Sequence, residues 1–498
     1  MAASRRPNKR SVPSAYDTVR EVEARVGSRT ASRPGVVLAI LALAGSGYAM
    51  LQSLVVPALP TLQKELDTSP TGVAWIFTTY LLAASVATPI AGRVGDMFGK
   101  KRTLLVVLTG LAGGTLLAAL ATTLPVLILA RAIQGVGGAV FPLAFGIIRD
   151  EFPRERVPSS IGLVSGLLGI GGGLGIVLAG PILAHLDYHW LFWIPFAVIV
   201  VTAVGTLFLV PESPIRSPGR VDWLGAVLLS SWLVCLLLSI SEAPHWGWTS
   251  ARTIGLGSVA VVLAVLWIRV EERSSTPLVD MKMMRLRAVW TTNFVGFVVG
   301  LGMFSAFVLI PLFVQTPTGN GYGFGSSVTA SGIFLIPSTV TMIISAPAAG
   351  RLSTRIGSKP PLVAGVAITM IALLLLAVAH SAHWPIYLSS LLLGIGVGFA
   401  FASMTNLIVE AVEPGQTGVA TGMNAVVRTI GGAVGGQVVA TFLAASVLVS
   451  GYPAESGYTW SFAVMATALG VGVVAALAVP GGVRRTHVVA AEPRLSVE

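Results

Sequence analysis

The chain has 498 residues, of which 54% are hydrophobic and only 11% are charged. This composition excludes an ordinary soluble domain, in which roughly 25% of the residues are charged. The formal net charge of +11 is compatible with nucleic-acid binding, but the basic residues lie between long apolar runs, which favours a helical membrane protein.

Apolar runs of membrane-spanning length recur along the whole chain. A helix that crosses a bilayer needs about 20 apolar residues. Fourteen runs qualify, at 36–58, 71–91, 103–121, 125–148, 158–183, 190–210, 222–241, 253–270, 290–314, 327–348, 362–380, 384–408, 417–447 and 459–481. The sequence therefore predicts an all-α polytopic membrane protein with 14 transmembrane helices.

The basic residues are sorted by side of the membrane. With the N-terminus in the cytoplasm, all Lys and Arg are cytoplasmic except four, which are Lys64 and Arg252 outside and Arg131 and Arg428 within spans. Basic loops face the cytoplasm in membrane proteins. We therefore predict that both termini are cytoplasmic. Because Arg greatly outnumbers Lys, we expect a bacterial protein in the inner (plasma) membrane.

The N-terminal segment 1–35 is polar and basic, and we interpret it as a cytoplasmic tail. The first two spans then carry aromatic and polar side chains that we expect to line a substrate cavity, namely Tyr48, Gln52, Trp75 and Tyr80. The single cysteine, Cys235, lies inside a later span, so the chain forms no internal disulfide and no Cys-based metal site.

The loop after the second span holds the densest charge cluster of the chain. Asp96 lies among Arg93, Lys100, Lys101 and Arg102, so its charge can be paired on either side. Three glycines, Gly92, Gly95 and Gly99, allow positive φ angles and close approach of two helices.

The same spacing returns 258 positions later. Arg351 corresponds to Arg93, and the glycines Gly350 and Gly357 correspond to Gly92 and Gly99. Thr354 stands where the first copy has its acid. Two copies of one turn predict a duplicated chain whose halves have become specialised.

The first copy resembles the loop signature of the major facilitator superfamily, G-x-x-x-D-x-x-G-[RK]-[RK]-[RK]. The resemblance implies a gating latch at the cytoplasmic face, in which Asp96 binds basic residues and the N-terminal dipole of the helix that begins near Pro360–Pro361. The latch residues it implies are Gly92, Arg93, Gly95, Asp96, Gly99, Lys100, Arg102, Gly350, Arg351 and Gly357.

Helix 125–148 carries Arg131 at membrane depth, where a charge costs about 3 kcal/mol. Gln134 lies one turn further on the same face. This pattern resembles the helix-4 motif of the superfamily, which implies proton coupling through Arg131 and a cavity position for Gln134. The alternative is that Arg131 only binds helix-end carbonyls. In the loop that follows, we expect Asp150 and Glu151 to belong to a solvated turn.

Helix 158–183 is rich in glycine, which lets helices pack closely and slide. It resembles in part the antiporter motif of the superfamily, which implies roles for Gly171, Gly175, Gly180 and Pro181. Isoleucine at position 176 replaces the usual proline of that motif. Glycine packing without any coupling role therefore remains an alternative.

Two further spans lie between the duplicated halves, in the segment 212–284. Together with Pro57 and Pro60 at the end of the first span, they resemble the 14-helix drug/proton antiporter branch, of the EmrB/QacA type. The resemblance implies a six-helix bundle at 36–211, a linker with two extra helices at 212–284, a second six-helix bundle at 285–482 and a cytoplasmic tail at 483–498. Members of that branch often have an acid where this chain has Leu51.

The second bundle supplies three further cavity candidates, which are Asn293, Asn424 and Arg428. Glu410 is the nearest acidic partner for Arg428 in the sequence, although a cap at the cytoplasmic face is an equal alternative for it. None of the acidic residues is expected at mid-membrane. This favours a neutral, zwitterionic or lipid-like substrate, or an anion that pairs with Arg131 or Arg428.

No phosphate-binding loop, metal cluster or hydrolase motif occurs in the sequence. We therefore expect a transporter rather than an enzyme, without cofactor and with the proton gradient as its energy source. The resemblance implies proton-coupled export of small hydrophobic compounds, such as drugs or antibiotics, by alternating access. Export of a lipid or cell-envelope precursor and uncoupled facilitated diffusion are the alternatives. The expected partners are the small-molecule substrate, membrane lipid and protons, with no nucleic acid and no obligatory protein partner.

Overall fold

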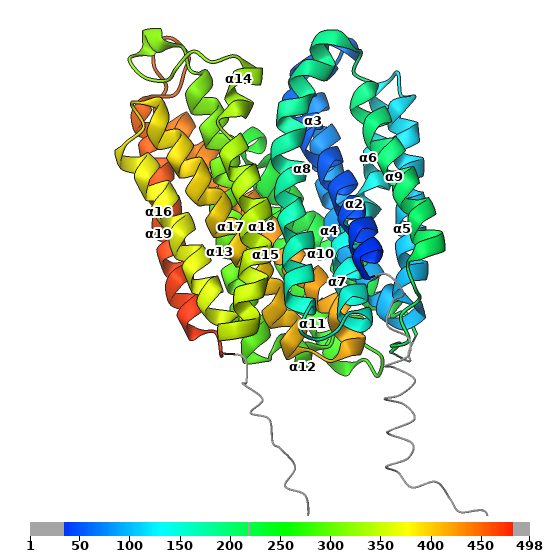
Figure 1. Cartoon of the computed structure of the whole chain (residues 1–498). Coiled ribbons are helices and arrows are strands. Elements are labelled where there is room, and N and C mark those ends of the chain that lie inside the picture. Colours follow the sequence, from blue (N-terminus) through cyan, green and yellow to red (C-terminus); the bar gives the residue numbers. More distant parts are fainter. Residues whose placement is uncertain (1–33, 218–219, 482–498) are drawn as a thin grey trace, which may run out of the picture.

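A computed structural model describes residues 34–217 and 220–481, which are almost entirely helical (Figure 1). The N-terminal helices pack as one half of the molecule, hereafter the N-half. They are α2 (Pro34–Ser53), α3 (Val55–Glu65), α4 (Pro70–Phe98), α5 (Lys100–Ala119), α6 (Leu124–Gln134), the 3₁₀ helix η1 (Gly135–Ala139), α7 (Val140–Glu151), α8 (Val157–His185) and α9 (Trp190–Leu209). Two helices follow, α10 (Trp223–Trp246) and α11 (Ala251–Arg273).

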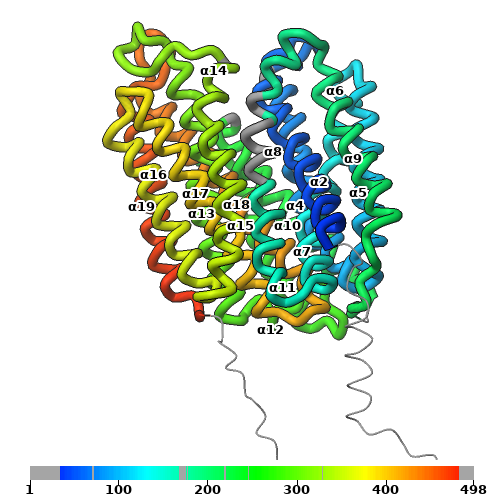
Figure 2. The backbone as a smooth tube through the Cα atoms, in the orientation of Figure 1, coloured from blue at the N-terminus to red at the C-terminus, as the bar shows by residue number. Residues whose placement is uncertain are grey.

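The remaining helices form the second half, hereafter the C-half. They are α12 (Met281–Met284), α13 (Arg287–Gln315), η2 (Thr318–Asn320), α14 (Val328–Ile333), α15 (Ile336–Ile356), α16 (Lys359–Val378), α17 (His383–Ala411), η3 (Pro414–Gln416), α18 (Thr417–Ala445) and α19 (Glu455–Ala478). The chain trace shows the two halves side by side, with α8 and α15 between their cores (Figure 2).

The prediction of a polytopic all-α protein is confirmed. Within the described residues, 13 helices are long and apolar enough to cross a membrane. The 29-residue α8 occupies the place of the remaining predicted span. A single predicted span is in several places two helices, because a proline or a run of glycines interrupts it. The span expected at 36–58, for example, breaks at Leu54, three residues before Pro57.

Each half has its own apolar core. Among the described residues, one cluster of buried side chains consists of N-half residues from Val37 to Val210 and includes Val409 from the C-half. A second cluster consists of C-half residues from Val295 to Val479. The inserted helix α10 packs on a third cluster with residues of α17 and α18. Its partner α11 exposes a row of apolar residues, Ile254, Val259, Val261, Val262, Val265, Leu266 and Ile268. Such a surface suits contact with lipid rather than with water.

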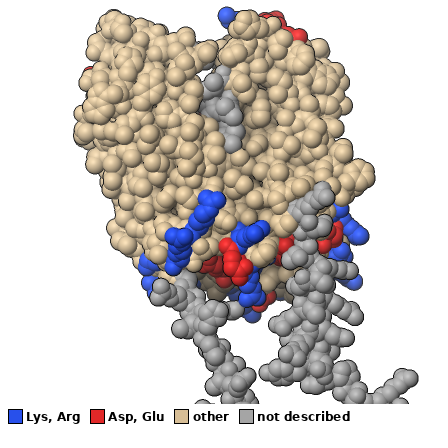
Figure 3. Space-filling model, in the orientation of Figure 1, with Lys and Arg blue, Asp and Glu red and all other residues tan. Residues whose placement is uncertain are grey.

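Charged side chains gather at one end of the molecule (Figure 3). We call this the basic end, and it contains the α4–α5 turn at Gly99 and the α15–α16 turn at Gly357. At the opposite end, the space-filling view is hollowed between the two halves (Figure 3). The halves therefore meet closely at the basic end, and at the opposite end a hollow lies between parts of them.

Candidate functional site

At the basic end, α4 of the N-half and α18 of the C-half touch through glycines. A Cβ atom on Gly92 would lie 2.5 Å from the carbonyl oxygen of Gly418, and a Cβ on Gly418 would lie 2.6 Å from that of Gly92. Real Cβ atoms do not approach an oxygen so closely. Glycine at both positions is therefore what allows the two backbones to meet.

Asp96 joins the halves one turn further along α4. Its carboxylate accepts hydrogen bonds from the backbone N–H groups of Gly418, at 3.2 Å, and Val419, at 3.1 Å. These N–H groups belong to the first turn of α18, where helix donors are unpaired and the dipole favours an anion. Asp96 is fully buried. The expectation that it binds the helix beginning near Pro360–Pro361 is wrong, because the N-terminus that it caps is that of α18.

A buried lysine connects this carboxylate to a second acid. The Nζ atom of Lys100 lies 3.5 Å from Oδ1 of Asp96 and 2.7 Å from Oδ2 of Asp150, and none of these side chains has exposed surface. The Lys100 stem fits against Gly146, whose Cβ would lie 2.6 Å from it. Ser213 donates a further hydrogen bond to Asp150. The interpretation of Asp150 as a solvated turn residue is wrong, since packing of Lys100 encloses it.

The turn between α4 and α5 depends on Gly99, which has a φ of +118°. Glu212 approaches this turn and accepts hydrogen bonds from the backbone N–H groups of Lys101, at 3.2 Å, and Arg102, at 3.3 Å. The Arg102 side chain adds an exposed ion pair with Glu212 at 3.7 Å. Gly95 also permits close packing, because its Cβ would lie 2.2 Å from Leu143.

Arg149 contributes three further bonds between the halves that the sequence did not indicate. It donates to the carbonyl oxygens of Val412, at 2.7 Å, and Glu413, at 3.2 Å, and to the hydroxyl of Thr417, at 2.6 Å. In the sequence, the position of Arg149 in the charged loop beside Asp150 could have indicated this role. Nearby, the Nε atom of Arg93 is buried and has no partner among the described residues.

The second copy of the turn lies at the contact of α15 with α8. A Cβ on Gly350 would lie 2.2 Å from the carbonyl oxygen of Pro158, so this backbone approach is also close. Gly357 ends α15 with a φ of +85°. Arg351 is exposed, and Thr354 only donates to the Arg351 carbonyl of its own helix, at 2.7 Å.

Arg131 is enclosed between α2, α4 and α6. It donates to the carbonyl oxygens of Ile76, at 3.1 Å, and Leu51, at 3.2 Å, and to Oε1 of Gln134, at 2.7 Å. Its guanidinium lies 4.0 Å from the ring centroid of Tyr80. No carboxylate among the described residues lies within ion-pair distance of it, and its second terminal nitrogen has no partner there.

The predicted cavity residues fall into two groups. Five of them are buried in helix contacts, which are Tyr48, Tyr80, Gln134, Asn293 and Asn424. Tyr48 and Tyr80 stack at a ring separation of 5.8 Å. Asn424 donates to Asn293 across α18 and α13, at 3.0 Å. Only Gln52, Trp75 and Arg428 keep part of their surface exposed.

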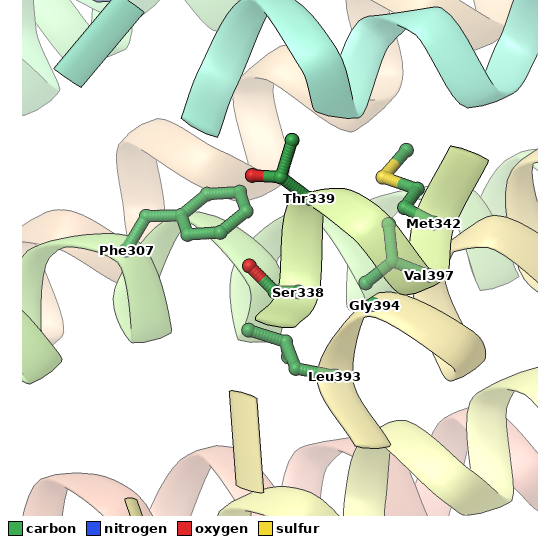
Figure 4. Close-up of a pocket in the computed structure, with 7 residues that line it drawn as sticks. All are labelled: Phe307, Ser338, Thr339, Met342, Leu393, Gly394 and Val397. Carbon is green, nitrogen blue, oxygen red and sulfur yellow. The ribbon is translucent and has the colours of Figure 1, made fainter. Parts of the chain in front are cut away.

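A small pocket in the C-half was not predicted from the sequence (Figure 4). It lies between α13, α15 and α17. Its lining is apolar except for two hydroxyls, and comprises Phe307, Ser338, Thr339, Met342, Leu393, Gly394 and Val397. In the view of Figure 4, Thr339 and Met342 lie at the upper edge of the pocket, Phe307 at its left and Leu393 at its lower edge.

Two glycines of the motif predicted on α8, Gly175 and Gly180, lie where α8 packs closely against other helices. A Cβ on Gly175 would lie 1.8 Å from the Ser53 hydroxyl, beside the break between α2 and α3. A Cβ on Gly180 would lie 2.5 Å from the Thr329 hydroxyl of α14, so α8 meets the C-half here. Pro181 follows inside the helix and is exposed. The surroundings of Gly171 fall outside the described part of the chain.

Comparisons with known proteins agree with this architecture. Residues 41–436 match the family model described as Major Facilitator Superfamily. The chain is 29% identical over 419 residues to the tetracenomycin C resistance and export protein of Streptomyces glaucescens, covering 83% of this chain and 77% of that protein. It is 30% identical over 421 residues to multidrug resistance protein 3 of Bacillus subtilis, covering 83% and 80%. The fold resembles the crystal structure of the human organic anion transporter MFSD10 (TETRAN), with a TM-score of 0.64, 17% identity and coverage of 89% and 99%.

Proposed function

Because the chain belongs to the major facilitator superfamily, we propose that it exports small hydrophobic compounds, such as drugs or antibiotics, in exchange for protons by alternating access. The chain is a multi-pass membrane transporter and not an enzyme. One relative is named a resistance and export protein and the other a multidrug resistance protein, which supports export as the direction. In this proposal the membrane is the bacterial plasma membrane, with the basic end and both termini in the cytoplasm.

The observation that carries the proposal is the bond of Asp96 to the first turn of α18. This bond joins the two halves, and it depends on a carboxylate charge that is buried away from water. A proton on Asp96 would remove the charge that attracts the helix N-terminus and Lys100. Protonation would therefore weaken the closure of the basic end and shift the population toward a state open to the cytoplasm.

Arg131 is the second proposed element of proton coupling. Its charge lies between carbonyl oxygens and the Tyr80 ring, without a carboxylate among the described residues. A proton that arrives near this site would be repelled by that charge, so movement of Arg131 would change the local proton affinity. We propose that the proton gradient is the energy source and that no cofactor is required.

The structure also contains one feature that favours uncoupled diffusion as a second candidate. The Arg131 guanidinium binds the backbone carbonyl of Leu51, the position at which relatives of the 14-helix branch often have an acid. Without a carboxylate at that position, the chain has fewer groups that could bind a proton at mid-membrane. The two candidates differ in whether protons move with substrate.

The test uses purified protein in liposomes that contain a pH-sensitive dye. A proton gradient is imposed, and ethidium, N-phenyl-1-naphthylamine, 8-anilinonaphthalene-1-sulfonate and tetracenomycin C are added separately. We expect at least one compound to cause proton movement in the wild type and none to do so in Asp96→Asn. Compound flux without proton movement would establish the facilitator, and absence of flux for all compounds would contradict drug export.

A further inference from the structure

Arg428 is a charged side chain to which the surrounding described residues supply no counter-charge. It is the twelfth residue of the 29-residue α18, which places it about 16 Å along the helix axis from Thr417 at 1.5 Å per residue. A cation at such depth is unfavourable unless something compensates its charge. The contacts of Arg428 show how far the protein itself stabilises this charge.

The stem and one face of the Arg428 side chain are held in place. Its guanidinium carbon lies 4.2 Å from the ring centroid of Phe401, a buried residue of α17. Gly300 of α13 lies against the stem, since a Cβ there would be 3.0 Å from the Arg428 Cγ. A cation–π contact of this kind stabilises the guanidinium from one face, and it leaves the N–H edge of the guanidinium available for an acceptor.

That free edge has no acceptor in the described protein. No hydrogen bond and no ion pair joins Arg428 to any described residue, in contrast to Arg131, which is fully buried and donates to three acceptors. The acid that the sequence suggested as its partner, Glu410, accepts a hydrogen bond from Ser358 at 3.1 Å instead. Arg428 also keeps part of its surface exposed, whereas Asn424, one turn closer to the basic end, is buried.

Arg428 lies on α18, the C-half helix whose first turn binds Asp96 of the N-half. The N-half contains a cluster of aromatic side chains around Tyr48 of α2. Tyr48 in turn packs on Tyr80 and Phe141 of the N-half, at ring separations of 5.8 and 6.1 Å. The C-half thus contributes a guanidinium without an acceptor among the described residues, the N-half contributes aromatic side chains, and the α4–α18 contact closes the basic end.

We propose that Arg428 binds the acidic group of the transported compound, so that the substrates are amphipathic organic anions whose apolar rings pack on the aromatic side chains of both halves. Carboxylates, sulfonates and ionised phenols all accept from a guanidinium in this way. Binding such an anion supplies the counter-charge that the protein lacks. This inference rests on the proposed function, because it names the substrate class of the same transporter.

The test is an equilibrium binding measurement, which does not depend on transport. The wild-type protein in lipid nanodiscs is titrated with 8-anilinonaphthalene-1-sulfonate and, separately, with N-phenyl-1-naphthylamine, which has the same ring system without the sulfonate. Energy transfer from the protein tryptophans to each dye reports binding. The variant Thr429→Ala is the control, because it changes the residue next to Arg428 on the same helix without changing the charge. The Thr429 hydroxyl only donates to the Ala425 carbonyl of its own helix, at 3.0 Å.

We expect saturable binding of the anionic dye by the wild type and by Thr429→Ala, and at least tenfold weaker binding by Arg428→Gln. The neutral dye should bind all three proteins equally, which would show that Arg428→Gln is folded. Arg428→Lys should keep most of the preference for the anion because it keeps the charge. Equal affinity of wild type and Arg428→Gln for the anionic dye, or no saturable binding of that dye by the wild type, would overturn the assignment of Arg428.

The two proposals fail in different ways. If export is wrong, no compound crosses the liposome membrane, yet the dependence of anion binding on Arg428 can still be measured in nanodiscs. If the anion site is wrong, transport proceeds while binding and flux of the anionic dye are the same in Arg428→Gln and the wild type.

Discussion

The two copies of the charged turn both bring helices of the two halves into backbone contact, but only one copy adds a charged bond to that contact. In both, a glycine lets one helix touch the backbone of a helix from the other half, Gly92 against Gly418 and Gly350 against Pro158. Only the first copy adds an acid, Asp96, that caps the helix it touches. The close approach is therefore common to both copies, and the charge-dependent bond belongs to one.

The helix on the receiving side explains the difference. The first-turn donors of α18 that bind Asp96 are the N–H groups of Gly418 and Val419, its second and third residues. The second residue of α8 is Pro158, which has no N–H group. An acid at Thr354 would find only one of the two donors, so the second copy gains little from a carboxylate.

The same contrast extends to the neighbouring pair. Lys100 binds Asp150 in the N-half, and at the corresponding positions of the C-half Ser358 binds Glu410. The first pair is a buried ion pair, and the second joins a neutral hydroxyl to an exposed acid. Buried charge is thus concentrated at one of the two turn contacts, and under the proposed function that contact is the one that responds to protons.

The largest expected effect is loss of transport when the first copy loses its charge. Asp96→Asn keeps the shape of the side chain but removes the charge that holds the α18 N-terminus and Lys100. We expect the rate of substrate transport to fall at least tenfold in liposomes, with normal expression. The matched variant Thr354→Ala removes only a bond within its own helix and should keep the wild-type rate. Wild-type transport by Asp96→Asn would show that transport does not need the charge-dependent bond of the first copy.

The second prediction compares the two pairs beside the turns. Asp150→Asn leaves Lys100 buried with a single, longer contact to Asp96, and breaking a buried ion pair costs about 3 kcal/mol or more. Glu410→Gln removes an exposed charge and should cost less than about 1 kcal/mol. Thermal unfolding of the detergent-solubilised variants, followed by tryptophan fluorescence, measures both. Equal losses of stability would show that burial of the first pair does not distinguish the copies.

The third prediction concerns what the copies share. Gly92→Ala and Gly350→Ala each place a methyl group within 2.5 Å of a backbone carbonyl, so both should force the halves apart at the basic end. Spin labels at Phe98 and Ile356, which are exposed at that end, would report the separation after the single cysteine is replaced. Gly113→Ala is the matched control, because no atom lies within 4 Å of its added Cβ. A longer distance in only one variant would mean that the second glycine contact is dispensable.

Much of this arrangement was predictable from the sequence, for physical reasons. The apolar runs predicted the membrane helices, since a bilayer fixes their length. The repeated glycine spacing predicted two related turns, and Gly99 and Gly357 do have positive φ. These features are local, so a sequence pattern of a few residues is enough to specify them.

The partners of these residues were not predictable in the same way. Asp96 binds α18, more than 300 positions away, although its charge pattern fits any helix N-terminus on that side. Asp150 has the sequence context of a solvated turn, and only the packing of Lys100 on Gly146 encloses it. The burial of Gln134 and Asn424 likewise follows from the packing of helices around them. Several polar residues at membrane depth, which the sequence predicted to line a cavity, therefore lie in contacts between helices.

The smallest expected effect would come from transferring the acid to the second copy. Thr354→Asp alone should change little, because Pro158 offers no N–H group, and Pro158→Ala alone should do the same because no carboxylate is there to accept. The double variant should stabilise the closed α15–α8 contact by about 0.5–1 kcal/mol more than the sum of the two single changes. This is the usual free energy of an anion at a helix N-terminus. The spin-label distance between positions 98 and 356 gives the populations from which this coupling is calculated. If Thr354→Asp produced the full effect with Pro158 still present, the proline would not be the reason for the asymmetry. The remaining donor in the first turn of α8 would then suffice, and the absence of an acid from the second copy would need another physical cause.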